Sequence, residues 1–148
     1  MFNPSREQVR RFFCDAWRKH GAREPLTPLE TLAADLVGRH PEYQALLADP
    51  EAALAAEFPP EAGRSNPFLH LSLHLSVLEQ LQIDQPPGIR DAWRALMRAT
   101  GDDEHEAAHR AIDALAETVW EAQRDRAPPS DERYLQRLRR AAGGPATA

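Results

Sequence analysis

Four prolines stand directly after residues that commonly border helices, and this feature constrains the fold more than any other. The dipeptides are Asn3-Pro4, Thr27-Pro28, His40-Pro41 and Asn66-Pro67. Proline at the first helical position loses no hydrogen bond, because that amide has no partner within the helix, and its φ angle is already helical. Asn and Thr side chains can also accept hydrogen bonds from the exposed amides of the first turn. We therefore expect each of these prolines to begin a helix.

The spacing of the apolar residues extends these starts into a series of helices separated by short loops. The expected helices cover 4–20, 28–39, 41–48, 51–57, 67–83, 89–99, 102–126 and 130–140. The sequence contains no hairpin pattern and no β-branched run with strand alternation. We predict an all-α, single-domain helical bundle of four to five main helices with short connecting helices over residues 1–140, followed by a disordered tail over 141–148.

One segment leaves the choice between helix and strand open. The residues FLHLSLHLS at 68–76 alternate strictly between apolar and polar side chains, which is the pattern of a half-buried strand. The preceding Asn66-Pro67, the scarcity of β-branched residues and the continuation VLEQLQ favour a helix.

The composition is that of an ordinary globular protein, and it argues against several functions. The 148 residues carry a formal net charge of −5, which argues against nucleic acid as a partner, since nucleic acid selects basic surfaces. The longest apolar-rich stretch, 67–78, is too short and too polar to span a membrane. The residues MFNPSREQVRR lack the apolar core of a signal peptide, so we expect a cytoplasmic protein. Cys14 is the single cysteine, which excludes an intramolecular disulfide, and we interpret it as a core residue.

Four of the six histidines form two pairs with i,i+4 spacing, the spacing that places two side chains on one helix face. At about 100° per residue, His70 and His74 share a face with apolar residues such as Val77 and Leu81. His105 and His109 lie at the border of the apolar stripe of the next long helix. Both pairs therefore point toward a predicted core or lie beside it.

A metal ion would satisfy several converging imidazoles at once, and helical bundles build metal sites from side chains on facing helices. The predicted ligands are His70, His74, His105 and His109. The residues predicted to orient or supplement them are Glu106, Asp113, Asp102 and His40. His40 would act as a helix border residue or add a ligand from a third helix. Imidazole and carboxylate ligands suit a divalent transition metal, and Zn, Fe, Mn and Ni all stay open.

Other interpretations of the histidines remain. The first is a structural network of polar side chains in a protein-interaction module, whose arginine-rich last helix docks a protein partner or a second copy of the chain. The second is a zinc-dependent hydrolase, because His105-Glu-Ala-Ala-His109 spells H-E-x-x-H, in which Glu106 would be the general base. The chain lacks the metzincin continuation of this motif, and no sheet is predicted to hold a substrate. The sequence does not decide whether the protein is an enzyme, and it specifies no substrate.

Several long segments carry a resemblance to a known family. They are MFNPSREQVRRFF, EPLTPLE, HPEY, NPFLHLSLHLSVLEQLQIDQPPGI and DEHEAAH followed by LAETVW. In these segments the chain resembles an uncharacterised proteobacterial family, one of the conserved domains of unknown function. The resemblance implies a small all-helical bacterial protein and supplies no activity. The paired histidines give a looser likeness to metal-binding bundles of the DinB and hemerythrin-like kind, which is an analogy of architecture only.

Overall fold

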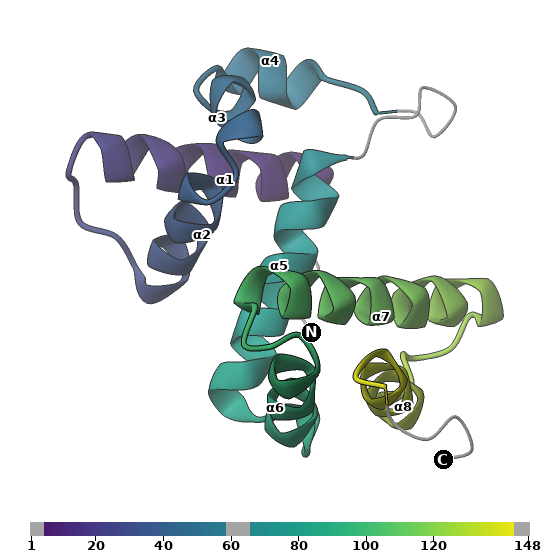
Figure 1. Ribbon diagram of the computed structural model, residues 1–148. Coiled ribbons are helices and arrows are strands. Elements are labelled where there is room, and N and C mark those ends of the chain that lie inside the picture. The colour runs from purple at the N-terminus through teal and green to yellow at the C-terminus, as the bar shows by residue number, and fades with distance from the viewer. Residues whose placement is uncertain (1–4, 59–65, 144–148) are drawn as a thin grey trace. The chain divides into compact units, whose positions relative to one another are not determined.

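Eight α-helices and no β-strand make up the part of the chain that the computed structural model describes, residues 5–58 and 66–143 (Figure 1). The helices are α1 (Arg6–Gly21), α2 (Pro28–Gly38), α3 (Pro41–Leu47), α4 (Pro50–Ala55), α5 (Pro67–Ile83), α6 (Ile89–Ala99), α7 (Glu104–Asp125) and α8 (Asp131–Ala141). The all-α prediction is confirmed. Six of these helices have eleven or more residues, which exceeds the four to five main helices expected.

The helices begin where the cap residues predict. Thr27 and Glu30 form a capping box at the start of α2, in which each side chain accepts a hydrogen bond from the backbone amide of the other. The side chain of Asn66 accepts hydrogen bonds from the first amides of α5, those of Phe68 and Leu69. The segment 68–76 is therefore helical, as the residues before and after it indicated. The start predicted at Pro4 and most of the tail predicted over 141–148 lie outside the described residues.

The chain divides into two compact units, Met1–Leu75 and Ser76–Ala148, and the division falls within α5. In the first unit α1 packs against α2, α3 and α4. The short helix α3 also contacts both of its neighbours in the chain, α2 and α4. The buried residues of this unit include Phe13, Cys14, Val37, Leu47 and Leu71. The predicted core position of Cys14 is confirmed, since its side chain is 2% exposed.

A buried arginine joins α1 to the C-terminal end of α4. Nη1 of Arg10 donates hydrogen bonds of 2.7 Å to the carbonyl oxygens of both Ala53 and Ala56. Its guanidinium lies over the ring of Phe68, 4.9 Å from the ring centre. The last carbonyls of a helix have no partner within it, so this cation closes the end of α4.

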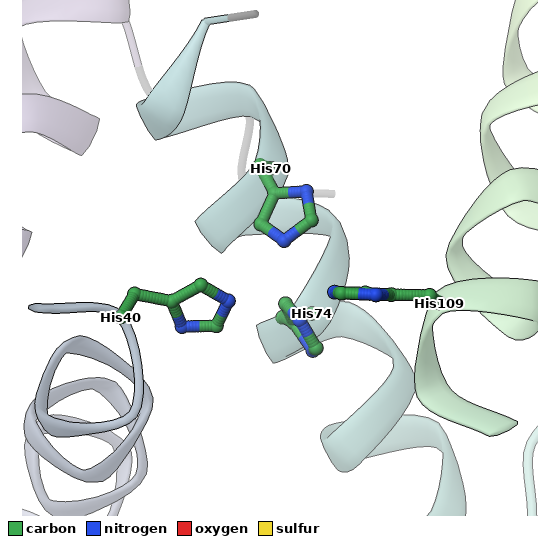
Figure 2. A group of neighbouring side chains, drawn as sticks. All are labelled: His40, His70, His74 and His109. Atoms are coloured by element: carbon green, nitrogen blue, oxygen red, sulfur yellow. The ribbon is translucent and has the colours of Figure 1, made fainter. Parts of the chain in front are cut away.

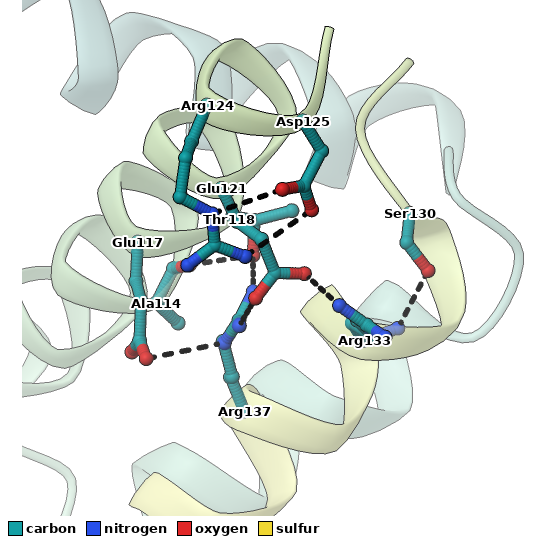
Figure 3. Close-up of polar contacts among 9 residues, drawn as sticks. All are labelled: Ala114, Glu117, Thr118, Glu121, Arg124, Asp125, Ser130, Arg133 and Arg137. Atoms are coloured by element: carbon teal, nitrogen blue, oxygen red, sulfur yellow. Dashed lines mark hydrogen bonds and ion pairs between the residues drawn. The ribbon is translucent and has the colours of Figure 1, made fainter. Parts of the chain in front are cut away.

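In the second unit α6, α7 and α8 all pack against one another. Figure 3 shows Glu121 of α7 between Arg133 and Arg137 of α8, and it pairs with both of them. Arg137 also donates a 2.9 Å hydrogen bond to the hydroxyl of Thr118, which in turn donates to the carbonyl of Ala114. Two arginines of the last helix are therefore engaged in holding α8 to α7, which weakens the interpretation of that helix as a docking surface.

The turn before α6 follows the sequence prediction for an aspartate before a break. Asp84 adopts a positive φ of 50°, and its carboxylate accepts a hydrogen bond from the backbone amide of Arg90. Arg90 returns two hydrogen bonds to the carbonyls of Leu81 and Gln82, so the turn is closed from both sides. Across the described residues, no helix combines the length and apolar character that crossing a membrane requires.

Candidate metal centre

Three histidines of the unit Met1–Leu75 are candidates for metal ligands, His40, His70 and His74 (Figure 2). Their rings form a nearly equilateral triangle. The ring centres are 5.1 Å apart between His40 and His70, 5.1 Å between His40 and His74, and 4.8 Å between His70 and His74. The predicted pair His70 and His74 is thus brought together with His40 as a third imidazole.

His40 reaches this cluster because proline follows it. Pro41 begins α3, and the residue before a proline is excluded from helical backbone angles, so His40 interrupts the path from α2 to α3 at φ −125° and ψ 71°. It occupies the N-cap position of α3, but its side chain makes no capping hydrogen bond. The ring instead is buried, with 4% of its surface exposed. The expected border residue is therefore also a member of the cluster.

A backbone carbonyl fixes the tautomer of His40. Its Nδ1 lies 2.7 Å from the carbonyl oxygen of Leu36. The carbonyl can only accept, so Nδ1 carries the proton and Nε2 presents a lone pair. In Figure 2 one nitrogen of His40 points toward His70 and His74. Metal-bound histidines commonly have this arrangement, in which the outer nitrogen is held by a hydrogen bond and the inner one binds the ion.

His70 and His74 are placed by the first turns of α5, where i,i+4 spacing sets both rings on one face of the helix. His74 is buried at 6% exposure, and His70 is half-buried. The two rings meet edge to face, with an angle of 78° between their planes. The Asn66 cap fixes the start of this helix, and so it fixes the height at which both imidazoles project.

Tyr43 forms one wall of the cluster, and the sequence analysis did not single it out. Its ring is parallel to that of His40, with 5.4 Å between ring centres, and it meets His70 edge to face at 6.1 Å. Burial raises the pKa of the Tyr43 phenol, and the nearby Glu42 charge adds to this effect. The available signal was the spacing His40-Pro-Glu-Tyr43, which places the tyrosine one helical turn after the histidine.

The ligand atoms of the three histidines lie within 4.8 Å of one another. Nitrogens bound to a tetrahedral zinc at about 2.1 Å are about 3.4 Å apart, so small inward movements of the rings would suffice to bind an ion. All members of the candidate group in the described part of the chain are histidines, with no carboxylate or thiolate among them. The donors are therefore neutral imidazoles, and this agrees with the residue type of the predicted ligands.

The remaining predicted residues belong to the second unit. His109 is half-buried on α7, and the ring of the exposed His105 lies 4.1 Å from it between centres. His105 is not among the candidate ligands found in the described residues. Its role as a ligand stays a prediction.

The three predicted carboxylates are exposed. Glu106 forms an ion pair of 3.1 Å with Arg110, one turn further along α7. Asp113 lines a shallow hollow with Arg110 and Arg137. Asp102 lies in the turn before α7 with a positive φ of 65°. The contacts given above for these three carboxylates do not involve a histidine. Their role in orienting metal ligands stays a prediction.

Comparison with known proteins adds a family but no activity. The family model described as a domain of unknown function, DUF1841, matches residues 5–140. This match confirms the resemblance to an uncharacterised conserved-domain family that the motifs indicated. Neither the curated proteins nor the solved structures contain a match to the chain.

Proposed function

The chain belongs to the DUF1841 family, whose function is unknown, and we propose that it binds a divalent transition metal through His40, His70 and His74. The observation that carries this proposal is the convergence of three imidazoles from two separate segments, with the inner lone pair of His40 set by the carbonyl of Leu36. A histidine network held by hydrogen bonds alone needs a donor for each inward lone pair. A metal ion accepts all the lone pairs at once.

His109 is the proposed fourth ligand. The sequence places it on the edge of the apolar stripe of α7, where the two predicted ligands of that helix lie. His105, on the same helix, is the alternative fourth ligand. Because the two histidines are four residues apart, replacing each in turn separates them.

The alternative of a zinc hydrolase built on His105-Glu106-Ala-Ala-His109 receives less support. A general base must reach the water that it activates. The carboxylate of Glu106 is half exposed and engaged with Arg110. The proposal therefore assigns no catalytic role to Glu106, and an enzymatic activity is not part of it.

Metal analysis of the full chain, purified without a histidine tag, tests the proposal. We expect about one equivalent of metal per chain in the wild type, and its loss in His70→Ala and in His109→Ala. His20→Ala is the matched control, because His20 is exposed at the end of α1 and should keep the metal. Far-UV circular dichroism of each variant separates loss of the site from loss of the fold.

The outcomes distinguish the hypotheses. Loss in His70→Ala with retention in His109→Ala would leave the three-histidine centre and remove His109. Loss in His105→Ala and His109→Ala with retention in His70→Ala would support the H-E-x-x-H motif against the cluster. A wild type that takes up no metal after loading with any of the four ions would refute the proposal and leave a structural histidine network.

A further inference from the structure

We propose that this centre selects a late first-row ion, of the zinc, nickel and copper class, and that the bound ion takes a small anion as an additional ligand. This inference rests on the proposed metal site and narrows it in two respects. The sequence alone left zinc, iron, manganese and nickel open, and it suggested that protein carboxylates would surround the ion. The imidazole donors and their surroundings in the first unit instead support a narrower choice of metal and an anion from solution as a further ligand.

The choice of metal follows from the donor atoms. Every candidate ligand in the described residues is an imidazole nitrogen, and the carboxylates near the sequence motif are exposed on α7. Imidazole suits zinc, copper, nickel and iron, whereas manganese and magnesium prefer carboxylate and other oxygen ligands, and iron stands next to manganese at the weak end of the affinity series. Affinity for nitrogen ligands also rises along the series from manganese to copper. A centre of this composition should therefore discriminate strongly against manganese.

The need for an anion follows from charge. Neutral imidazoles leave a divalent ion with its full charge of about +2, because no ligand neutralises it. The partner that holds His40 from behind is the carbonyl of Leu36, which is neutral as well. His40 and His74 are only 4% and 6% exposed, so water screens this charge poorly.

The charged side chains close in sequence do not supply the balancing charge. Arg39 pairs with Asp35 on the exposed side of α2, with 3.0 Å between nitrogen and oxygen. The side chain of Glu42, next to Tyr43, is exposed to solvent, which screens its charge from the cluster. A buried charge without compensation is costly, so a small anion that binds the ion gains that compensation. Its chemistry is that of an inorganic monoanion or the carboxylate group of a small molecule.

Cobalt-substituted protein provides the test, because Co²⁺ occupies zinc sites and its visible absorption reports the coordination of the ion. Metal-depleted wild-type chain is loaded with Co²⁺ and titrated with azide in one arm and with acetate in the other. We expect a saturable change of the visible bands in each arm if the shared chemistry is a monoanion. A response to azide alone would restrict the ligand to inorganic anions. His20→Ala should respond as the wild type does, and His70→Ala should show no cobalt bands.

A second measurement tests selectivity without any variant. Zinc-loaded chain is dialysed against an excess of Mn²⁺ and separately against Ni²⁺, and the metal content is measured. Retention of zinc in Mn²⁺, with affinity for Mn²⁺ lower by about a hundredfold or more, is the expected result. Cobalt bands that neither anion changes would overturn the anion ligand, and displacement of zinc by Mn²⁺ would overturn the selectivity, while both leave the metal site intact. Failure to bind cobalt and zinc at all would instead refute the proposed function.

Discussion

Replacing Arg10 by methionine tests whether a buried cation stabilises the first unit. Methionine keeps an unbranched apolar stem but removes the donor that closes α4. The carbonyls of Ala53 and Ala56 would each lose a 2.7 Å hydrogen bond. The Ala56 carbonyl also accepts a 3.0 Å hydrogen bond from Nη2 of Arg6, so only the Ala53 carbonyl loses its side-chain donor. A buried acceptor that loses its partner costs about 1–3 kcal/mol, which is the gross loss expected.

Part of this loss is offset because the charge itself is expensive where it lies. Burial lowers the pKa of the Arg10 guanidinium, and the neighbouring Arg6 lowers it further. Within the described residues, Nε and Nη2 of Arg10 have no hydrogen-bond partner. Removing a buried charge that no carboxylate pairs can itself be stabilising. We therefore expect a net decrease in the free energy of unfolding near the lower end of the range, about 1 kcal/mol.

Urea unfolding followed by far-UV circular dichroism measures the difference, and Arg11→Met is the matched control. Arg11 is the next residue of the same helix, and its exposed side chain pairs only with Glu7, one turn away. An exposed pair of this kind contributes about 0.3–0.5 kcal/mol, so the control should be nearly neutral. If Arg10→Met were as stable as Arg11→Met, or more stable than the wild type, the closing of α4 by Arg10 would not be a net source of stability.

Three further predictions concern single groups in either unit. Hydrogen bonds from Arg133 and, second, from Arg137 lower the pKa of Glu121. Glu121→Gln should therefore be less stable than the wild type near neutral pH. The difference in urea midpoint should vanish as pH falls through the lowered pKa, because the wild-type carboxylate then becomes neutral as well. Equal differences at neutral and acidic pH would contradict this. The thiol of Cys14, whose pKa burial raises, should not react with Ellman's reagent in the native protein and should give about one equivalent in denaturant. Thr27→Ala should lower the free energy of unfolding by about 1 kcal/mol through loss of the α2 cap, and an unchanged urea midpoint would count against that role.

The helices could be predicted closely because caps and prolines act locally. The predicted starts at Pro28, Pro41 and Pro67 are those of α2, α3 and α5. The start of α7 differs from the expected residue 102 because the side chain of Asp103 caps the helix by accepting the amide of Glu106. The preceding residue takes a positive φ, which no periodicity reveals. Local chemistry therefore sets the elements, and the remaining differences are small shifts at helix ends, such as α4 at Pro50–Ala55 against the expected 51–57.

The candidate site could be predicted only in part, because it depends on contacts between distant segments. Helical phase was sufficient to place His70 and His74 on one face, since they share a helix. His40 lies thirty residues earlier, and its position before a proline gave an adequate local explanation as a helix border residue. Only packing within the first unit brings its ring 5.1 Å from the other two. The predicted ligands were all imidazoles, whereas the carboxylates expected to orient them, such as Glu106 and Asp113, are exposed on α7.

The H-E-x-x-H spelling is the feature most easily overinterpreted, and exposure is what weakens it. Its first histidine and its glutamate both lie at the solvent-facing start of α7, where acidic residues are favoured by the helix dipole whatever the function. Glu106 follows this rule, since it stands in the first turn and pairs with Arg110 one turn later. The pair His70 and His74, spelled without a glutamate, instead packs against a third imidazole whose tautomer is fixed by a backbone carbonyl. A metal site is indicated more strongly by buried donors with held outer nitrogens than by a motif on one exposed turn.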